Sequence, residues 1–92
     1  MKLEKSIAGF QGYTQPAQLI YNTNEKENTD IDGIVEYGIC VHIIFSDGKT
    51  MSESVNGITP NKTEIESLTQ FLFDNSIYPS SLKYIVEDIL SA

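Results

Sequence analysis

The spacing of apolar residues changes near residue 57, and this change constrains the fold more than any other feature of the sequence. Before it, apolar residues fill every second position of a long stretch, namely Tyr37, Ile39, Val41, Ile43 and Phe45. This is the period with which a β-strand places side chains on one face. After it, apolar residues recur every three or four positions, which is the period of a helix. A chain of 92 residues supports one modest core, so we predict a single α+β domain over residues 1–92.

The strongest local signal is a β-hairpin over residues 36–56. Ser46, Asp47 and Gly48 follow the alternating strand and are typical of a turn. Two registers are open: a two-residue Asp47–Gly48 turn, or a three-residue loop with Gly48 left-handed as a bulge. The second is preferred because it places the large apolar residues of both strands on the buried face. Its pairs are Ile43 with Met51 and Ile39 with Val55.

Residues 1–35 carry weaker signals. Alternation between Lys2 and Ile7 predicts a first strand, and residues 17–22 predict a second short one. The stretch from Asn22 to Gly33 is acidic and has a single apolar side chain. We therefore predict a solvated loop there.

Residues 61–91 are predicted to form two helices. Asn61 is a typical N-cap, and Glu64 three residues later completes a capping-box pattern. The first helix should end near Asn75, and Pro79 should begin the second. The apolar stripes are Ile65, Leu68 and Leu72, supported by Phe71, and then Leu82, Ile85, Val86 and Ile89. The predicted fold is an antiparallel sheet of three to four strands followed by two C-terminal helices packed on one face.

Parts of the hairpin and of the helices resemble a known family. Tyr37-Gly38-Ile39 opens the long strand, and the tail after Pro79 contains Leu82, Ile85, Val86, Glu87, Asp88, Ile89 and Leu90. From Glu36 to Leu90 the chain resembles a family of small Firmicutes proteins with a domain of unknown function. The resemblance implies a Firmicutes origin and a cytoplasmic location, and it implies no activity and no functional residues.

The charge of the chain excludes several classes of partner. Thirteen carboxylates against six lysines, with no arginine, give a net charge of -7, which repels phosphate backbones and anionic lipids. We expect no direct binding to nucleic acid or membrane. The longest apolar run, Ile39–Phe45, is too short to span a bilayer and contains His42. The sole cysteine, Cys40, cannot form an internal disulfide, so we predict a cytoplasmic protein.

One acidic segment matches half of a calcium-binding loop. Asn28, Asp30, Asp32 and Gly33 reproduce the first part of an EF-hand pattern. The twelfth position, which needs a bidentate glutamate, is Ile39, and helices are not predicted on either side. We therefore expect an ordinary acidic loop and no metal site.

Cys40 and His42 lie two residues apart and therefore on one face of the predicted strand. They could supply two metal ligands, but Glu53 would join them only in the tighter hairpin register. No nucleophile, base and oxyanion donors can be assembled around Cys40. We predict that the protein is not an enzyme and has no cofactor.

Ile44 points away from the face that carries Ile43 and Phe45. Either the sheet is covered on both sides, or an apolar spot is left for a partner. We therefore predict a non-enzymatic protein-interaction or regulatory module, with Cys40, His42 and Ile44 as its candidate interaction face. A homodimer through this face, or through the edge strand Thr50–Val55, would account for Ile44.

The alternative hypothesis rests on the acidic loop. A regulatory or phage-derived inhibitor could present carboxylates to a basic nucleic-acid-binding protein. The carboxylates concerned are Glu25, Glu27, Asp30 and Asp32.

Overall fold

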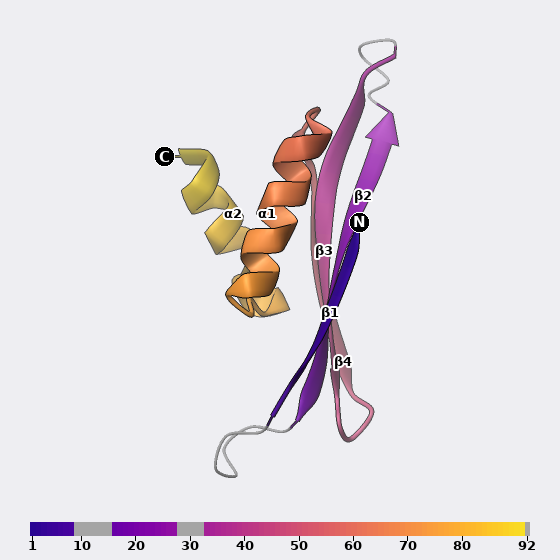
Figure 1. Ribbon diagram of the computed structural model, residues 1–92, viewed down its shortest axis with the longest axis vertical. Helices are drawn as coiled ribbons and strands as arrows, with labels where there is room; N and C mark the ends of the chain where they lie inside the picture. The colour runs from indigo at the N-terminus through magenta and orange to yellow at the C-terminus, as the bar shows by residue number, and fades with distance from the viewer. Residues whose placement is uncertain (9–15, 28–32, 92) are drawn as a thin grey trace.

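The computed structural model describes residues 1–8, 16–27 and 33–91. It contains a four-stranded antiparallel sheet with two helices on one face (Figure 1). The strands follow chain order across the sheet: β1 (Lys2–Ile7), β2 (Ala17–Glu27), β3 (Val35–Phe45) and β4 (Thr50–Thr59). The helices are α1 (Lys62–Asp74), the short 3-10 turn η1 (Pro79–Ser81) and α2 (Leu82–Ser91). The predicted fold class is confirmed.

The hairpin between β3 and β4 has the preferred three-residue register. The Phe45 N–H donates to the Lys49 carbonyl (2.8 Å), and the Gly48 N–H donates to the Phe45 carbonyl (2.9 Å). Gly48 has a φ of 89°, a left-handed conformation that suits glycine. The observed pairs include Ile43 with Met51 and Ile39 with Val55, as predicted. The expected burial of Met51 is wrong, because it is 52% exposed, whereas Val55 packs against the core.

The prediction of a loop is wrong for residues 22–27, because β2 continues through them to Glu27. They pair with β3 up to the pair Glu27–Val35. Their side chains lack the apolar alternation of a strand, so the sequence does not predict one here. Hydrogen bonding to β3 keeps this stretch extended, and this tertiary contact overrides the local preference for a loop. Residues 28–32 lie outside the described residues, so the expectations for Asn28, Asp30 and Asp32, an acidic loop without a metal site and carboxylates offered to a basic protein, stay predictions. β4 likewise continues past the predicted end at residue 56, through Gly57 (φ 62°) to Thr59.

Gly38 sits where the register of β3 and β4 shifts, between Tyr37 and Ile39. A Cβ atom built on Gly38 would collide with the Val55 carbonyl oxygen and would lie 2.6 Å from Asn24 Oδ1. Packing therefore explains why glycine stands at this position of the Tyr37-Gly38-Ile39 string, since the neighbouring backbone leaves no room for a side chain.

The core lies between the sheet and the helices. Odd-numbered residues of β2 and β3 face the helices and are fully buried: Leu19, Tyr21, Ile39, Val41 and Ile43. Ile65 and Leu72 of α1 and Leu82 and Val86 of α2 close the core from the other side. Alternation on the strands and helical periodicity therefore meet in one apolar layer.

Tyr21 is the largest fully buried side chain. Its hydroxyl donates to the Ile77 carbonyl (3.0 Å), and its ring meets Phe73 edge-on, with centroids 5.9 Å apart. Burial, with a smaller contribution from Tyr78, raises the pKa of Tyr21 to about 12. This residue ties the centre of the sheet to the segment that joins the two helices.

The N-terminus of α1 is capped as predicted, with one addition. Asn61 Oδ1 accepts from the Glu64 N–H (3.1 Å), which is the first half of a capping box. Thr59 completes the other half: its Oγ1 accepts from the Asn61 N–H (3.1 Å) and donates to Glu64 Oε2 (2.7 Å). The end of β4 and the start of α1 are thereby joined.

The C-terminus of α1 lies at Asn75, as predicted. The Ser76 N–H donates to the Phe73 carbonyl (3.1 Å), and the Ile77 N–H donates to the Leu72 carbonyl (3.0 Å). This is the Schellman pattern, in which the residue after the cap is left-handed and usually glycine. Ser76 fills that position with a φ of 50°.

The predicted helical stripes need one correction. Phe71 does not support the core, because its side chain is 46% exposed; Thr69 is buried instead and donates its hydroxyl to the Ile65 carbonyl (2.7 Å). Ile89 is 41% exposed, since the end of α2 leans away from the sheet (Figure 1). Helical spacing identified an apolar stripe but not its rotation against the sheet.

Candidate functional site

Cys40, His42 and Ile44 lie in a row on β3, on the face opposite the helices. Their neighbours on β2 are Asn22, Ile20 and Gln18, and their neighbours on β4 are Ser54, Ser52 and Thr50. All three side chains are half-buried. In Figure 1 both helices lie on the other side of the sheet. We call the face that holds these three residues the open face; its role as an interaction surface stays a prediction.

The chemistry of Cys40 is that of a protonated thiol. Burial raises its pKa above the ordinary value, and the negative charge of Glu53 adds to the effect. Glu53 pairs with Val41, so its side chain is on the helix side, where its Oε1 lies 3.3 Å from Lys83 Nζ. Cys40, His42 and Glu53 are therefore not brought together. Within the described residues, no three His, Cys, Asp or Glu side chains are grouped to hold a metal ion.

Charge is divided unequally between the two sides of the sheet. Among the residues that the structure describes, strand alternation places two lysines, Lys2 and Lys26, and two glutamates, Glu4 and Glu36, on the open face. The helix side, meaning the helices with the strand residues that face them, carries eight of the described carboxylates and three of the described lysines. The carboxylates are Glu25, Glu27, Glu53, Glu64, Glu66, Asp74, Glu87 and Asp88, and the lysines are Lys5, Lys62 and Lys83. The helix side is therefore strongly acidic, while the open face is neutral.

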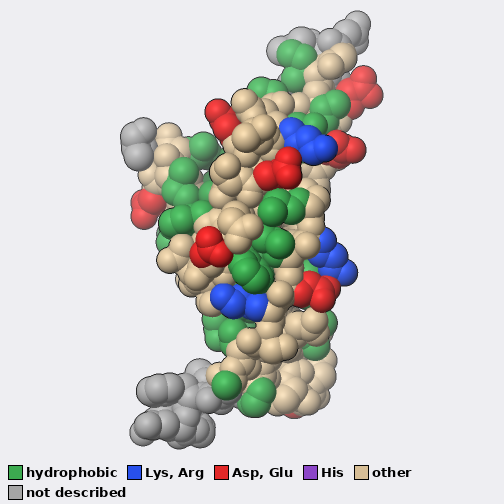
Figure 2. Space-filling model, viewed as in Figure 1, with side chains coloured by type: hydrophobic (Ala, Val, Ile, Leu, Met, Phe, Trp, Pro, Cys, Tyr) green, Lys and Arg blue, Asp and Glu red, His purple; other side chains and the backbone are tan. Residues whose placement is uncertain are grey.

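An apolar groove lies on the helix side, between α1 and the end of α2. It has a volume of about 450 Å³, and Leu68, Phe71 and Ile89 supply its apolar lining. Thr63, Glu64 and Ser67 complete it. Figure 2 shows hydrophobic side chains gathered over α2 on this side of the molecule. Leu90, which follows Ile89, is 60% exposed.

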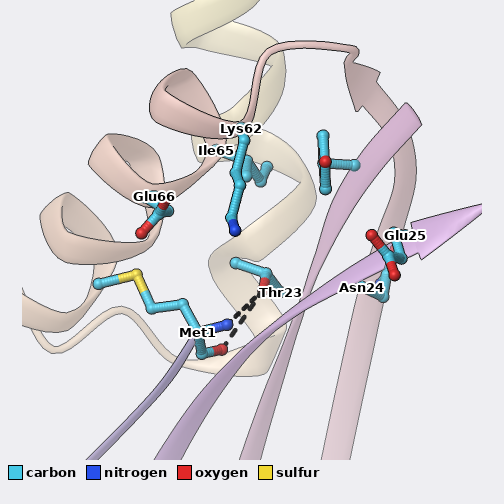
Figure 3. A pocket seen from close by; sticks show the side chains of 8 residues that line it. Met1, Thr23, Asn24, Glu25, Lys62, Ile65 and Glu66 are labelled. Carbon is cyan, nitrogen blue, oxygen red and sulfur yellow. Dashed lines mark hydrogen bonds between the residues drawn. The ribbon is translucent and has the colours of Figure 1, made fainter. Parts of the chain in front are cut away.

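A second, smaller pocket of about 270 Å³ lies between the start of β1, the second half of β2 and the first turn of α1 (Figure 3). The Met1 ammonium donates to Thr23 Oγ1 (2.9 Å), and Lys62, Glu25 and Glu66 line the walls. Two cationic and two anionic groups balance, so the pocket has no charge preference for a ligand.

The alternation along β3 correctly predicts that Cys40, His42 and Ile44 share one face, but the helical spacing does not predict the groove. That spacing assigns Phe71 and Ile89 to buried stripes, whereas the structure places both on the surface. One signal was available: each helix has more apolar residues than a single face accommodates, and an excess of this kind indicates a second contact surface. Neither helix of the described chain is long and apolar enough to cross a membrane.

Comparison with known proteins gives a family and no relative of established activity. No curated protein and no solved structure matches the chain. The model of one family, described as "Family of unknown function (DUF6514)", matches residues 2–92. The chain therefore belongs to this family of unknown function, DUF6514.

Proposed function

We propose that the protein is a non-enzymatic binding module that docks a basic segment of a partner protein on its helix side. One observation carries the proposal: an apolar groove of about 450 Å³ lies on the side that holds the excess of carboxylates. Apolar anchors surrounded by charge are a common way to recognise an amphipathic helix. The partner of matching chemistry has apolar residues on one face and lysines or arginines beside them.

The exposed side chains support this choice of surface. Phe71 and Ile89 are 46% and 41% exposed, and Leu90 is 60% exposed. On the open face, the apolar residues Ile20, Cys40 and Ile44 are half-buried among polar neighbours. A partner would therefore remove more apolar area from water at the groove than at the open face.

A second copy of this chain fits the groove less well than a basic partner. The chain carries a net charge of -7, and a dimer through the helix side would bring two acidic surfaces together. Like charges across an interface oppose association. A basic nucleic-acid-binding protein is one partner with suitable charge, and a cytoplasmic location agrees with the lone cysteine. The Firmicutes origin implied by the resemblance stays a prediction.

The test compares two exposed apolar residues of similar exposure, Phe71 (46%) and Met51 (52%). A partner is captured from a lysate of cells that express this protein, and it is then purified. Its affinity for the wild type, Phe71→Ser and Met51→Ser is measured at several salt concentrations. We expect Phe71→Ser to weaken binding at least about tenfold, Met51→Ser to leave it unchanged, and the affinity to fall as salt rises. Wild-type affinity in Phe71→Ser, or no dependence on salt, contradicts the proposal.

A further inference from the structure

The outer edge of β4 presents backbone groups that the sheet does not use. The ladder between β3 and β4 begins with the bond from the Phe45 N–H to the Lys49 carbonyl (2.8 Å). Hydrogen-bonded pairs alternate with non-bonded pairs in an antiparallel ladder. Thr50, Ser52 and Ser54 therefore point their N–H and C=O groups away from β3. In the part of the chain that the structure describes, no strand pairs with this edge.

β4 lacks the residues that usually protect an edge strand. Lysine, proline and short length keep other strands from pairing with an exposed edge. The opposite edge strand, β1, is six residues long and contains Lys2 and Lys5. β4 is ten residues long, has neither lysine nor proline, and has one charged residue, Glu53. The edge of β4 is the one suited to strand addition.

A pocket of about 340 Å³ lies beside this edge, between β4 and the helices. Tyr84, which is 72% exposed, stands in its wall with two carboxylates and one lysine. The lining residues are Glu53, Pro79, Ser80, Lys83, Tyr84 and Glu87. An aromatic ring beside a net negative charge suits a cationic side chain.

Glu53 connects the edge and the pocket. Its Oε1 accepts from the Ser54 N–H (3.3 Å) and lies 3.3 Å from Lys83 Nζ. An added strand would give Ser54 a carbonyl acceptor and release the Glu53 carboxylate from the Ser54 N–H, while the contact with Lys83 stays. The residue of that strand opposite Glu53 would point to the helix side, with its Cβ about 5 Å from that of Glu53. Its side chain would enter the pocket.

We propose that the outer edge of β4 binds an extended peptide segment of a partner protein as an antiparallel fifth strand, with a lysine or arginine opposite Glu53 in the pocket of Tyr84 and Glu87. A second copy of β4 does not fit this role, because no residue from Thr50 to Thr59 is cationic. The edge of β4 is a different surface from the groove, so failure of binding at one surface does not decide binding at the other.

The first experiment selects binding peptides and locates them. A display library of random nine-residue peptides is selected against the full chain, and an enriched peptide is synthesised. We expect one enriched position to be lysine or arginine. Hydrogen exchange measured by NMR should slow at least about tenfold at Ser52 and Ser54 when this peptide binds. The amides of Met51 and Glu53, already bonded to β3, should change little. Enrichment without a cationic position, or protection elsewhere, overturns the proposal.

Two substitutions test the backbone and the charge separately. Ser52→Pro removes an outward N–H that the ladder with β3 does not use, and we expect it to abolish peptide binding. Ser6→Pro is the matched control on the opposite edge strand, β1. The Thr23 N–H donates to the Met1 carbonyl, and bonded and non-bonded residues alternate from there, so the Ser6 N–H points away from β2. Ser6→Pro should retain wild-type affinity.

Glu53→Gln keeps the backbone intact and serves if Ser52→Pro fails to fold. We expect it to weaken the lysine-containing peptide about tenfold and to leave unchanged the affinity of the same peptide with leucine at that position. Equal affinity of wild type and Glu53→Gln for the lysine peptide overturns the proposal. If Phe71→Ser loses peptide binding while Ser52→Pro retains it, the peptide binds in the groove. This result also overturns the proposal.

Discussion

The open face and the helix side are built from the same strands yet differ in packing and charge. All ten buried hydrophobic residues of the described chain lie on the helix side, together with eight carboxylates and three lysines. The open face has two lysines, two glutamates and the half-buried row of Cys40, His42 and Ile44. Strand alternation therefore sorts net charge as well as hydrophobicity. The acidity of the whole sequence belongs mainly to the side that also carries the apolar groove.

The largest expected effect compares one core residue with one open-face residue. Leu72→Ala removes a fully buried side chain and should lower the free energy of unfolding by about 3 kcal/mol. Ile44→Ala removes a half-buried one and should cost under about 1 kcal/mol, because water already reaches this face. Urea unfolding of both variants measures the difference. Equal losses would show that the open face is covered as fully as the core, contrary to this expectation.

The next effect depends on pH and concerns Tyr21. Its folded-state pKa is about 12, above the ordinary value of 10.0, so the unfolded chain ionises first as pH rises. The wild type should therefore lose stability between pH 10 and pH 12, by an amount on the order of 2 kcal/mol. Tyr21→Phe should be less stable at pH 7, having lost the bond to Ile77, and the gap should close through this window. A gap that stays constant up to pH 12 contradicts the assignment.

The parts of the fold that the sequence predicted are those set by neighbouring residues. Ser46, Asp47 and Gly48 determine the turn and the register after it, and Asn61 with Glu64 marks the start of α1. Alternation alone places Cys40, His42 and Ile44 on one face. Each of these features depends on residues close together in the chain.

The remaining features depend on contacts between distant segments. β2 reaches Glu27 because β3 lies beside it, and its own side chains carry no strand pattern there. The groove exists because Phe71 turns outward and the end of α2 leans away from the sheet. Periodicity predicts that a helix has an apolar stripe, but the rotation and tilt of the helix come from packing.

A smaller effect is expected at the joint between the helices. Among the described residues, the positive-φ positions outside the helical layer are the glycines Gly33, Gly48 and Gly57. In the helical layer the positive-φ position is occupied by Ser76. A left-handed conformation costs a residue with a side chain about 1 kcal/mol, so Ser76→Gly should stabilise the protein by roughly that amount. Thermal unfolding measures the gain. Ser80→Gly, within η1, is the control and should bring none; a gain there would contradict the role of φ at residue 76.

The smallest effect concerns the thiol of the open face. Burial and the charge of Glu53 raise the pKa of Cys40, which lowers the fraction of reactive thiolate at neutral pH. We expect iodoacetamide to modify Cys40 more slowly in the folded protein than in the protein unfolded in urea at the same pH. Faster reaction in the folded state would indicate an activated thiol and would make the open face a chemical site.

We propose that the basic partner docks in the groove of the helix side, so the open face, which the sequence predicted as the interaction face, should stay free of this partner. The most direct measurement is a map of backbone amide shifts in the labelled protein during titration with the purified partner. We expect the largest shifts at Leu68, Phe71 and Ile89, with small shifts at Cys40, His42 and Ile44. Large shifts confined to the last three residues, with the groove unchanged, would contradict the proposal.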